Sequence, residues 1–189
     1  MTQPTREKIL DAVFALVYTK GYNGTSMSMI LEACQIPKGS LYHHFSSKKA
    51  MVLAVLKERI APRMDQFYDL RASAENHEID TIIAAIVKVA DNRELLCYGC
   101  PLNRLNQEMA PVDNDFEYEI NIIYEALKDK LVQLLKRSRL QENVNSEMLS
   151  EFIIATVWGA LSLSPNHSSK ARYLQTISHL IAYLKTLKR

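Results

Sequence analysis

Hydrophobic residues recur along this chain with the spacing of amphipathic helices, and no segment sustains the two-residue alternation of a half-buried strand. From position 27 to 34 an apolar stripe falls at i, i+3, i+4 and i+7, and Thr25 can cap this helix through its side-chain oxygen. Pro37 prevents the helix from continuing, and it pushes Ile36 into a turn where its side chain can fill the gap between helices. The pattern predicts a helix followed by a four-residue break.

A second, very short helix is predicted from Lys38 to Phe45. Leu41 and Phe45 lie one turn apart and can both face a core. The side chains left on the outward side are rich in hydrogen-bond donors and include no acid: Lys38, Gly39, Ser40, Tyr42, His43 and His44. The two helices together favour a DNA-reading helix-turn-helix within residues 25–51.

Two further helices are predicted around this segment. The first has Pro4 in its first turn, carries an apolar stripe from residue 9 to 17, and ends before Gly21, which can supply a left-handed cap. The second is capped by Ser46 or Ser47 and starts with two lysines, at positions 48 and 49. Cations at a helix N-terminus are unfavourable because the macrodipole is positive there, unless a polyanion such as a phosphate lies nearby.

Helical spacing continues to the end of the chain. Pro62 marks a kink or boundary, residues 72–77 read as a loop, Cys97 to Pro101 interrupts the pattern, and Pro111 closes a short helix. The remaining helices are predicted at residues 79–90, 102–109, 114–139, 146–163 and 169–184. No internal repeat or low-complexity tract interrupts this order. The sequence therefore predicts an all-α fold of about nine helices.

Composition is that of an ordinary globular protein, with 189 residues, 48% hydrophobic and 23% charged. No apolar run approaches the roughly 18 to 20 residues of a bilayer span. The first ten residues lack the apolar region of a secretory signal, and three cysteines are an odd number for a disulfide framework. We therefore expect a cytoplasmic protein without a membrane anchor.

Charge is distributed unevenly along the chain. Residues 1–60 hold eight Lys and Arg against four Asp and Glu, whereas residues 61–189 hold 15 against 17. A modest basic surplus can be a solvated surface, but it also assists binding to a duplex because neutralised phosphates release counterions. The surplus coincides with the predicted helix-turn-helix, which favours the second interpretation.

Two patterns suggest other chemistry. His43 and His44 are consecutive on a helix and point about 100° apart, with no Cys or acid at ligand spacing, so no metal is expected. Cys97 and Cys100 have the C-x-x-C spacing of zinc and thiol sites. Further zinc ligands and a βαβ context are missing, which favours two structural thiols with Gly99 in a turn. A redox- or electrophile-sensing role, and a small thiol oxidoreductase, remain the alternatives.

The N-terminal quarter resembles the TetR/AcrR family of bacterial transcriptional regulators. The resemblance rests on the runs Gly-Tyr-x-Gly-Thr-Ser at 21–26, Ile-Pro-Lys-Gly-Ser-Leu-Tyr-His-His-Phe at 36–45 and Ser-Lys-Lys-Ala at 47–50. It covers about residues 5–56, and the later residues match only in helix number and order. The resemblance implies a homodimeric regulator that is not an enzyme, needs no cofactor and represses until a small molecule binds. Nothing in the sequence separates a repressor from an activator, and a non-DNA interaction module that reuses the same head is a further alternative.

The resemblance also implies roles for individual residues. Residues 1–47 would form the DNA-binding domain and 48–189 the domain that binds a small-molecule effector and dimerises. A palindromic operator in double-stranded DNA would be contacted at its phosphates by Thr25, Ser26, Tyr42, His44 and Lys48, and at its base edges by Lys38, Gly39, Ser40 and His43. Effector-pocket candidates are Phe67, Leu105, Met109, Phe116, Tyr124, Phe152 and Trp158. Apolar positions on more than one seam of the last helix are candidates for the dimer interface: Tyr173, Leu174, Ile177, Leu180, Ile181 and Leu184.

Overall fold

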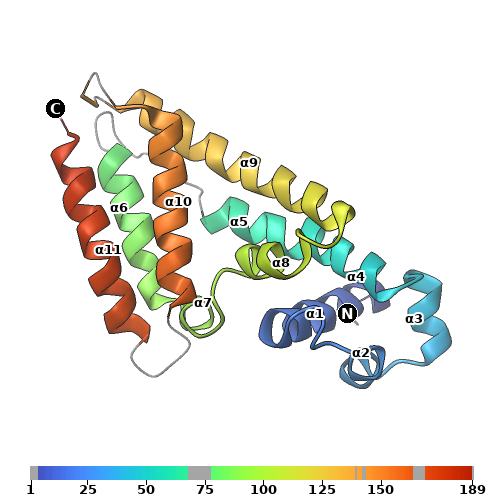
Figure 1. The fold of residues 1–189 in the computed structure, drawn as a ribbon. Helices are drawn as coiled ribbons and strands as arrows, with labels where there is room; N and C mark the ends of the chain where they lie inside the picture. Colours follow the sequence, from blue (N-terminus) through green and yellow to red (C-terminus); the bar gives the residue numbers. More distant parts are fainter. Residues whose placement is uncertain (1–3, 68–77, 139, 142–143, 164–168, 189) are drawn as a thin grey trace. The chain divides into compact units, whose positions relative to one another are not determined.

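Helices form nearly all regular structure in residues 4–67, 78–138, 140–141, 144–163 and 169–188, which are the residues that the computed structural model describes (Figure 1). Within these ranges the one other regular pairing is an isolated antiparallel bridge between Leu140 and Lys188. The predicted all-α class is confirmed. None of the described helices combines the length and apolar character that a membrane crossing would require.

The helical segments follow the predicted order, except that a helix over Arg93–Tyr98 was not predicted and includes Cys97, where an interruption was expected to begin. The loop predicted at 72–77 lies outside the described residues. The segments are α1 (Thr5–Lys20), α2 (Met27–Cys34), α3 (Lys38–His44), α4 (Lys48–Val55), η1 (Leu56–Ile60), α5 (Ala61–Phe67), α6 (Glu78–Lys88), η2 (Val89–Asp91), α7 (Arg93–Tyr98), α8 (Pro101–Met109), α9 (Asn114–Arg137), α10 (Ser146–Ser162) and α11 (Ser169–Thr186).

Two compact units divide the chain. Unit 1 comprises residues 1–63 and 101–123, and unit 2 comprises residues 64–100 and 124–189. The helix-turn-helix therefore shares a unit with α4, α8 and the first part of α9, because α4 packs on α1 and α8 contacts η1. A functional division at residue 47 stays a prediction, and the packing does not follow it.

The core of unit 1 is made by the stripes that the sequence predicts. Ile9, Val13, Ile30, Leu41 and Met51 have no exposed surface. Each such side chain contributes roughly 1.5–3 kcal/mol relative to an exposed one. Leu41 of α3 is buried like the core residues of α1, α2 and α4, so the short α3 is held by packing and not by its own length.

Gly21 ends α1 with a φ of 80° and a ψ of 171°. Its positive φ agrees with the expected glycine cap, whereas its ψ lies outside the left-handed helical region. Gly24 follows in the same link, and a Cβ there would lie 2.2 Å from the carbonyl oxygen of Lys20. The link between α1 and α2 is therefore tight at both glycines.

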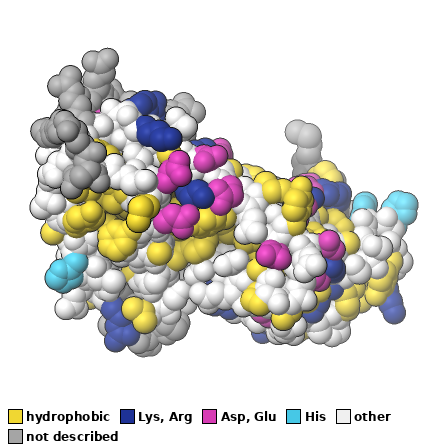
Figure 2. All heavy atoms as spheres, turned by 45° about the horizontal axis from the view of Figure 1, so that its top comes forward, with side chains coloured by type: hydrophobic (Ala, Val, Ile, Leu, Met, Phe, Trp, Pro, Cys, Tyr) yellow, Lys and Arg dark blue, Asp and Glu magenta, His cyan; other side chains and the backbone are white. Residues whose placement is uncertain are grey.

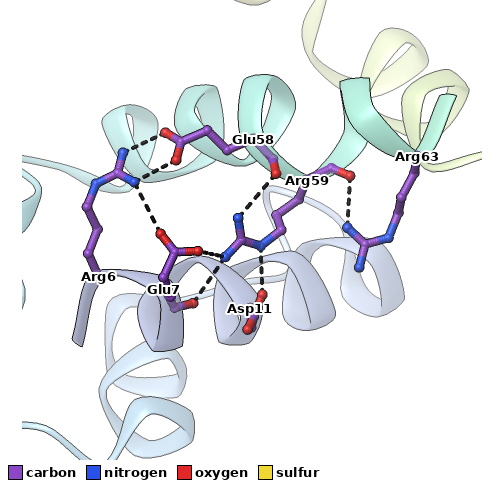
Figure 3. A network of polar contacts seen from close by, with 6 residues as sticks. All are labelled: Arg6, Glu7, Asp11, Glu58, Arg59 and Arg63. Carbon is purple, nitrogen blue, oxygen red and sulfur yellow. Dashed lines mark hydrogen bonds and ion pairs between the residues drawn. The ribbon is translucent and has the colours of Figure 1, made fainter. Parts of the chain in front are cut away.

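Charged side chains tie α1 to the helix that follows α4 (Figure 3). Arg6 donates two hydrogen bonds to the carboxylate of Glu58, at 2.6 and 2.5 Å. Arg59 pairs with Glu7 at 2.5 Å and with Asp11 at 2.6 Å. The hydrogen bonds from Arg6 lower the pKa of the Glu58 carboxyl. Such bidentate, charge-assisted pairs fix direction as well as distance, so the network orients α1 against η1.

The kink expected near Pro62 takes the form of a change in helix type. Residues Leu56–Ile60 form a π-helical turn between α4 and α5, and Pro62 is the second residue of α5. Leu56 and Ile60 are both buried, while Arg59 reaches α1. Rare π turns of this kind are commonly kept at functional positions.

Helices α6, α10 and α11 lie side by side in unit 2 (Figure 1). Tyr173 on α11 is buried and donates its hydroxyl to the carbonyl oxygen of Ile86 on α6 at 2.8 Å. Ile177, Leu180 and Leu184 continue this buried seam. The inner face of α11 is thus a core face of its own unit.

Candidate nucleic-acid interface

The link between α2 and α3 has the geometry of a helix-turn-helix. Gln35 ends α2 in the left-handed conformation, with φ 50° and ψ 44°, and Pro37 precedes the first residue of α3. Leu41 and Phe45 are buried as their spacing predicts, with exposures of 0% and 7%. Because the inner side of α3 is anchored in this way, its outer side is presented as one rigid surface.

The outer side of α3 carries the predicted donors. Lys38, Gly39, Tyr42 and His43 are exposed, while Ser40 and His44 are half-buried. The ammonium of Lys38 lies 5.8 Å from the centre of the Tyr42 ring. A Cβ at Gly39 would meet no atom within 4 Å, so the backbone there is open to close approach. In the described part of the chain no acid pairs with Lys38. This surface can donate hydrogen bonds to base edges and phosphates.

The predicted roles of Thr25 require correction. Its side chain is 1% exposed, and its hydroxyl donates to the carbonyl oxygen of Gly21 at 2.7 Å. The cap of α2 is Ser26, whose hydroxyl accepts from the backbone N–H of Met29. Thr25 closes the turn from inside, because its methyl and hydroxyl both fit the core side of the link. Ser26 remains exposed and available to a ligand.

Lys48 is held at the start of α4 by the link between α1 and α2. Its ammonium donates to the carbonyl oxygens of Tyr22 and Thr25, both at 3.0 Å, and lies 4.1 Å from the centre of the Tyr22 ring. The carbonyls and the ring offset the unfavourable helix dipole at this position. The side chain is half-buried and joins the start of α4 to the start of α2.

Lys49 has a different partner from the phosphate that the sequence suggested. Its ammonium pairs with Asp113 at 2.7 Å and with Asp115 at 2.8 Å, at the start of α9. Hydrogen bonds to these two carboxylates raise the pKa of Lys49, and the bond from Lys49 lowers the pKa of Asp113. The ion pairs bring α4 and α9 together within unit 1.

The effector-pocket candidates fall into both compact units. Leu105, Met109 and Phe116 belong to the core of unit 1, where Phe116 meets the Tyr22 ring edge-on at 5.3 Å. The side chain of Phe67 lies outside the described part of the structure. Three of the seven residues are therefore core residues of the unit that holds the helix-turn-helix.

Tyr124 and Trp158 are the half-buried candidates in unit 2, with ring centres 5.6 Å apart. Burial raises the pKa of Tyr124 to about 12, assisted by its hydroxyl's hydrogen bond to Glu151 at 3.1 Å. Phe152 is 49% exposed and packs edge-on against Tyr183 of α11, and its role in the effector pocket stays a prediction. It lies on the surface of the α10–α11 pair.

The predicted dimer-interface residues also separate into two sets. Tyr173, Ile177, Leu180 and Leu184 are at most 2% exposed, so the prediction is wrong for these four. They pack inside unit 2 because α11 lies against α6. Leu174 and Ile181 are half-buried on α11, and the prediction for them stays open.

An exposed apolar stripe on α10 was missed. Met148, Phe152, Ala155 and Gly159 are all exposed and recur at i, i+4, i+7 and i+11. Figure 2 shows hydrophobic side chains exposed on unit 2, in the left part of that view. A Cβ at Gly159 would meet nothing within 4 Å. The periodicity of these four residues was visible in the sequence and could have identified the stripe.

The two spaced cysteines differ in exposure. Cys97 is exposed at the end of α7, whereas Cys100 is buried with its sulfur 3.9 Å from that of Met64. Gly99 makes the expected turn between them, with a φ of 80°. Cys34 is buried, and burial raises the pKa of its thiol. In the described ranges no three metal-binding side chains of the His, Cys, Asp or Glu type come together. A sensing role for the thiols stays a prediction.

Comparisons with known proteins agree with this geometry. Residues 9–55 match the model of the family described as bacterial regulatory proteins, tetR family. An uncharacterised HTH-type transcriptional regulator from the lacX 3' region of Lactococcus lactis is 28% identical over 164 residues, covering 84% of this chain and 82% of the relative. The HTH-type transcriptional repressor NemR of Escherichia coli is 26% identical over 188 residues, covering 97% and 93%. The crystal structure of a TetR transcriptional regulator from Chloroflexus aurantiacus superposes with a TM-score of 0.84 at 25% identity, covering 97% of this chain and 95% of that one.

Proposed function

Because the chain belongs to the TetR family of bacterial regulatory proteins, we propose that it is a dimeric repressor that a small molecule releases from a palindromic operator. The observation that carries the proposal is the outer side of α3, where donors are exposed on a helix anchored by Leu41 and Phe45 and where α3 contributes no acid. The proposal that the protein represses transcription is supported by its similarity, over nearly the whole chain, to NemR, which is named a transcriptional repressor.

The contacts proposed with DNA follow from exposure and chemistry. Lys38, Gly39, Ser40 and His43 would approach base edges, since lysine donates to guanine acceptors and glycine permits close approach. Contacts with phosphates are assigned to Ser26, Tyr42, His44 and Lys48. Base contacts from lysine and serine discriminate less sharply than bidentate contacts from arginine or glutamine would.

The homodimer is proposed to use the exposed faces of α10 and α11. Met148, Phe152, Ala155 and Gly159 supply an apolar stripe on α10, and Tyr183 extends it onto α11. Small side chains at 155 and 159 let a second helix approach closely, and the large ones offer area to bury. Two heads held in this way can read half-sites separated by about 34–36 Å, or one helical turn.

The effector is proposed to bind in the C-terminal part of the chain, with Tyr124 and Trp158 as the candidate lining residues. Their rings are half-buried and meet edge-on, and aromatic side chains of this kind suit an apolar or aromatic ligand. Glu151, hydrogen-bonded to Tyr124, would orient a donor on such a ligand. The effector need only change the preferred separation of the two heads to weaken operator binding.

The test is selection of bound sequences from a random pool of duplex DNA by the full-length protein. A palindrome should be enriched, and members of a small-molecule library that act as effectors should release it. The matched variant is Lys38→Ala, which should enrich the palindrome poorly. If the wild-type protein enriched no palindrome, the proposed function would be wrong.

A further inference from the structure

The carboxylate of Glu108, at the end of α8, binds the backbone of the link between α1 and α2. Its Oε2 accepts from the N–H of Tyr22 at 2.8 Å, and its Oε1 accepts from the N–H of Asn23 at 2.7 Å. Each carboxylate oxygen therefore accepts one hydrogen bond, and the two donors are consecutive backbone amides. Hydrogen bonds to a charged acceptor are roughly twice as strong as neutral ones, and a pair of them fixes orientation. Glu108 is 86 residues from Tyr22 in sequence, so this is a tertiary clamp.

The backbone of the link is shaped to receive this carboxylate. A Cβ at Gly21 would lie 2.8 Å from Oε2 of Glu108 and 3.2 Å from Oε1. A side chain at position 21 would therefore displace the carboxylate. It would also be strained, because the φ of 80° is one that residues other than glycine rarely adopt. Gly21 and Glu108 are complementary, because the carboxylate of Glu108 occupies the space that a side chain at position 21 would need.

The clamped residues in turn hold groups at the proposed DNA surface. The carbonyl oxygen of Tyr22 accepts from Lys48, and the centre of the Tyr22 ring lies 4.1 Å from that ammonium and 5.3 Å from the centre of the Phe116 ring. The backbone N–H of Thr25 donates to the same carbonyl, and the next residue is the exposed cap Ser26. The positions of Lys48 and Ser26 thus depend on Tyr22, whose amide Glu108 holds.

We propose that Glu108 is a positioning residue for DNA binding. It touches no DNA, and it acts by fixing the Tyr22–Asn23 backbone so that Ser26 and Lys48 meet phosphates at the correct spacing. This inference rests on the proposed function. It assigns to α8 a direct role in the affinity of the head, through two backbone hydrogen bonds that no local sequence pattern contains.

The direction in which Glu108→Gln changes the affinity for DNA distinguishes a positioning role from a purely electrostatic effect. Removing an acid from a DNA-binding unit reduces repulsion of the polyanion and should strengthen binding if charge alone matters. Positioning predicts the opposite, because Glu108→Gln leaves one amide oxygen to accept and turns an NH2 group toward the second backbone N–H. Glu119→Gln is the matched control: it removes the same charge from unit 1, where Glu119 pairs with Lys57 at 2.7 Å, without touching the link.

The experiment measures the affinity of full-length wild type, Glu108→Gln and Glu119→Gln for the selected palindrome across a salt series. We expect Glu108→Gln to bind roughly tenfold more weakly, from the loss of charged hydrogen bonds, and Glu119→Gln to bind equally or more tightly. The salt slope of Glu108→Gln should fall below that of wild type, by at most about 0.9, since Lys48 is no longer held at its phosphate. Equal or tighter binding by Glu108→Gln would overturn the inference while leaving the proposed function intact.

Amide hydrogen exchange distinguishes positioning from general loss of folding. In Glu108→Gln the amides of Tyr22 and Asn23 should exchange faster, while those of α2 and α3 keep their wild-type rates. Faster exchange throughout α1 to α4 would mean that the variant destabilises the whole head, and it would overturn the assignment of a positioning role. Failure of the wild-type protein to select any DNA would instead contradict the proposed function itself.

Discussion

The ammonium nitrogen of Lys48 lies 3.0 Å from the carbonyl oxygen of Tyr22 and 4.1 Å from the centre of the same residue's ring. A second carbonyl, that of Thr25, accepts from it at 3.0 Å. An ammonium carries three N–H donors, so one remains after these two bonds. Lys48 can therefore hold the link between α1 and α2 and still contact a phosphate.

Replacing Lys48 should test both roles at once. Lys48→Ala should weaken operator binding, and the slope of log affinity against log salt should fall by about 0.9, the value expected for one phosphate contact. Titrations of the selected palindrome at several salt concentrations measure both quantities. Lys57→Ala, which removes a cation paired with Glu119, is the control and should change the slope less. An unchanged slope with weaker binding would leave Lys48 with a structural role only.

Lys38 and Tyr42 should differ in how they affect specificity. Lys38→Ala should weaken binding by about 1–3 kcal/mol and relax the preference at one base pair, because lysine donates to guanine acceptors. Tyr42→Phe removes only a hydroxyl and should weaken binding to all sequences similarly. Competition binding against single-base variants of the palindrome measures the difference. Wild-type affinity in both variants would remove α3 from the proposed interface.

The proposed dimer surface predicts different effects of the same substitution at two positions in unit 2. Phe152→Glu should raise the dimer dissociation constant about tenfold or more, as expected for a large apolar residue at an interface, while the helix content stays at the wild-type level. Ile177→Glu should instead unfold unit 2, because Ile177 is fully buried. Light scattering after size exclusion and circular dichroism separate the outcomes. Ile122→Glu, an exposed substitution on α9, is the control for added charge.

The pair formed by Arg6 and Glu58 predicts a pH dependence of stability. Its hydrogen bonds lower the pKa of Glu58 in the folded protein, so the pair contributes fully above the unfolded value of about 4.3. The contribution is lost as pH falls through the lower, folded-state pKa. The difference in urea midpoint between wild type and Glu58→Gln should therefore shrink on acidification from pH 7 to pH 3. A difference that stayed constant or grew would contradict the assignment, and Glu32→Gln, at an exposed site on α2, should show little difference throughout.

Local periodicity was enough to predict the orientation of α3. Leu41 and Phe45 are one turn apart, and no other pair in so short a helix can face inward while Pro37 fixes where it begins. The same reasoning gave part of the buried faces of α1 and α2. It missed Tyr18, which is buried on α1, and it included Leu31, which is half-buried on α2. These parts of the fold and of the candidate interface follow from residues close in sequence.

Features that depend on contacts between residues far apart in the sequence could not be predicted from local periodicity. Thr25 and Ser26 both carry a hydroxyl that can cap α2, and only the packing of the link places Thr25 inside. The last helix has apolar residues on more than one seam, and its contact with α6 decides which seam is buried. The partners of Lys49 lie 64 residues away or more. Neither composition nor spacing identifies them.

The π turn from Leu56 to Ile60 holds one residue more than an α turn would. An α turn closes between residues i and i+4 and a π turn between i and i+5, so the π turn absorbs one residue without changing the direction of the later side chains. Deleting one residue between 56 and 60 should therefore convert the turn to α geometry, and Arg63, which lies 4.2 Å from the Phe14 ring, would still point toward α1. Inserting one residue in α geometry after Ile60 would instead rotate every later side chain of the helix by about 100°.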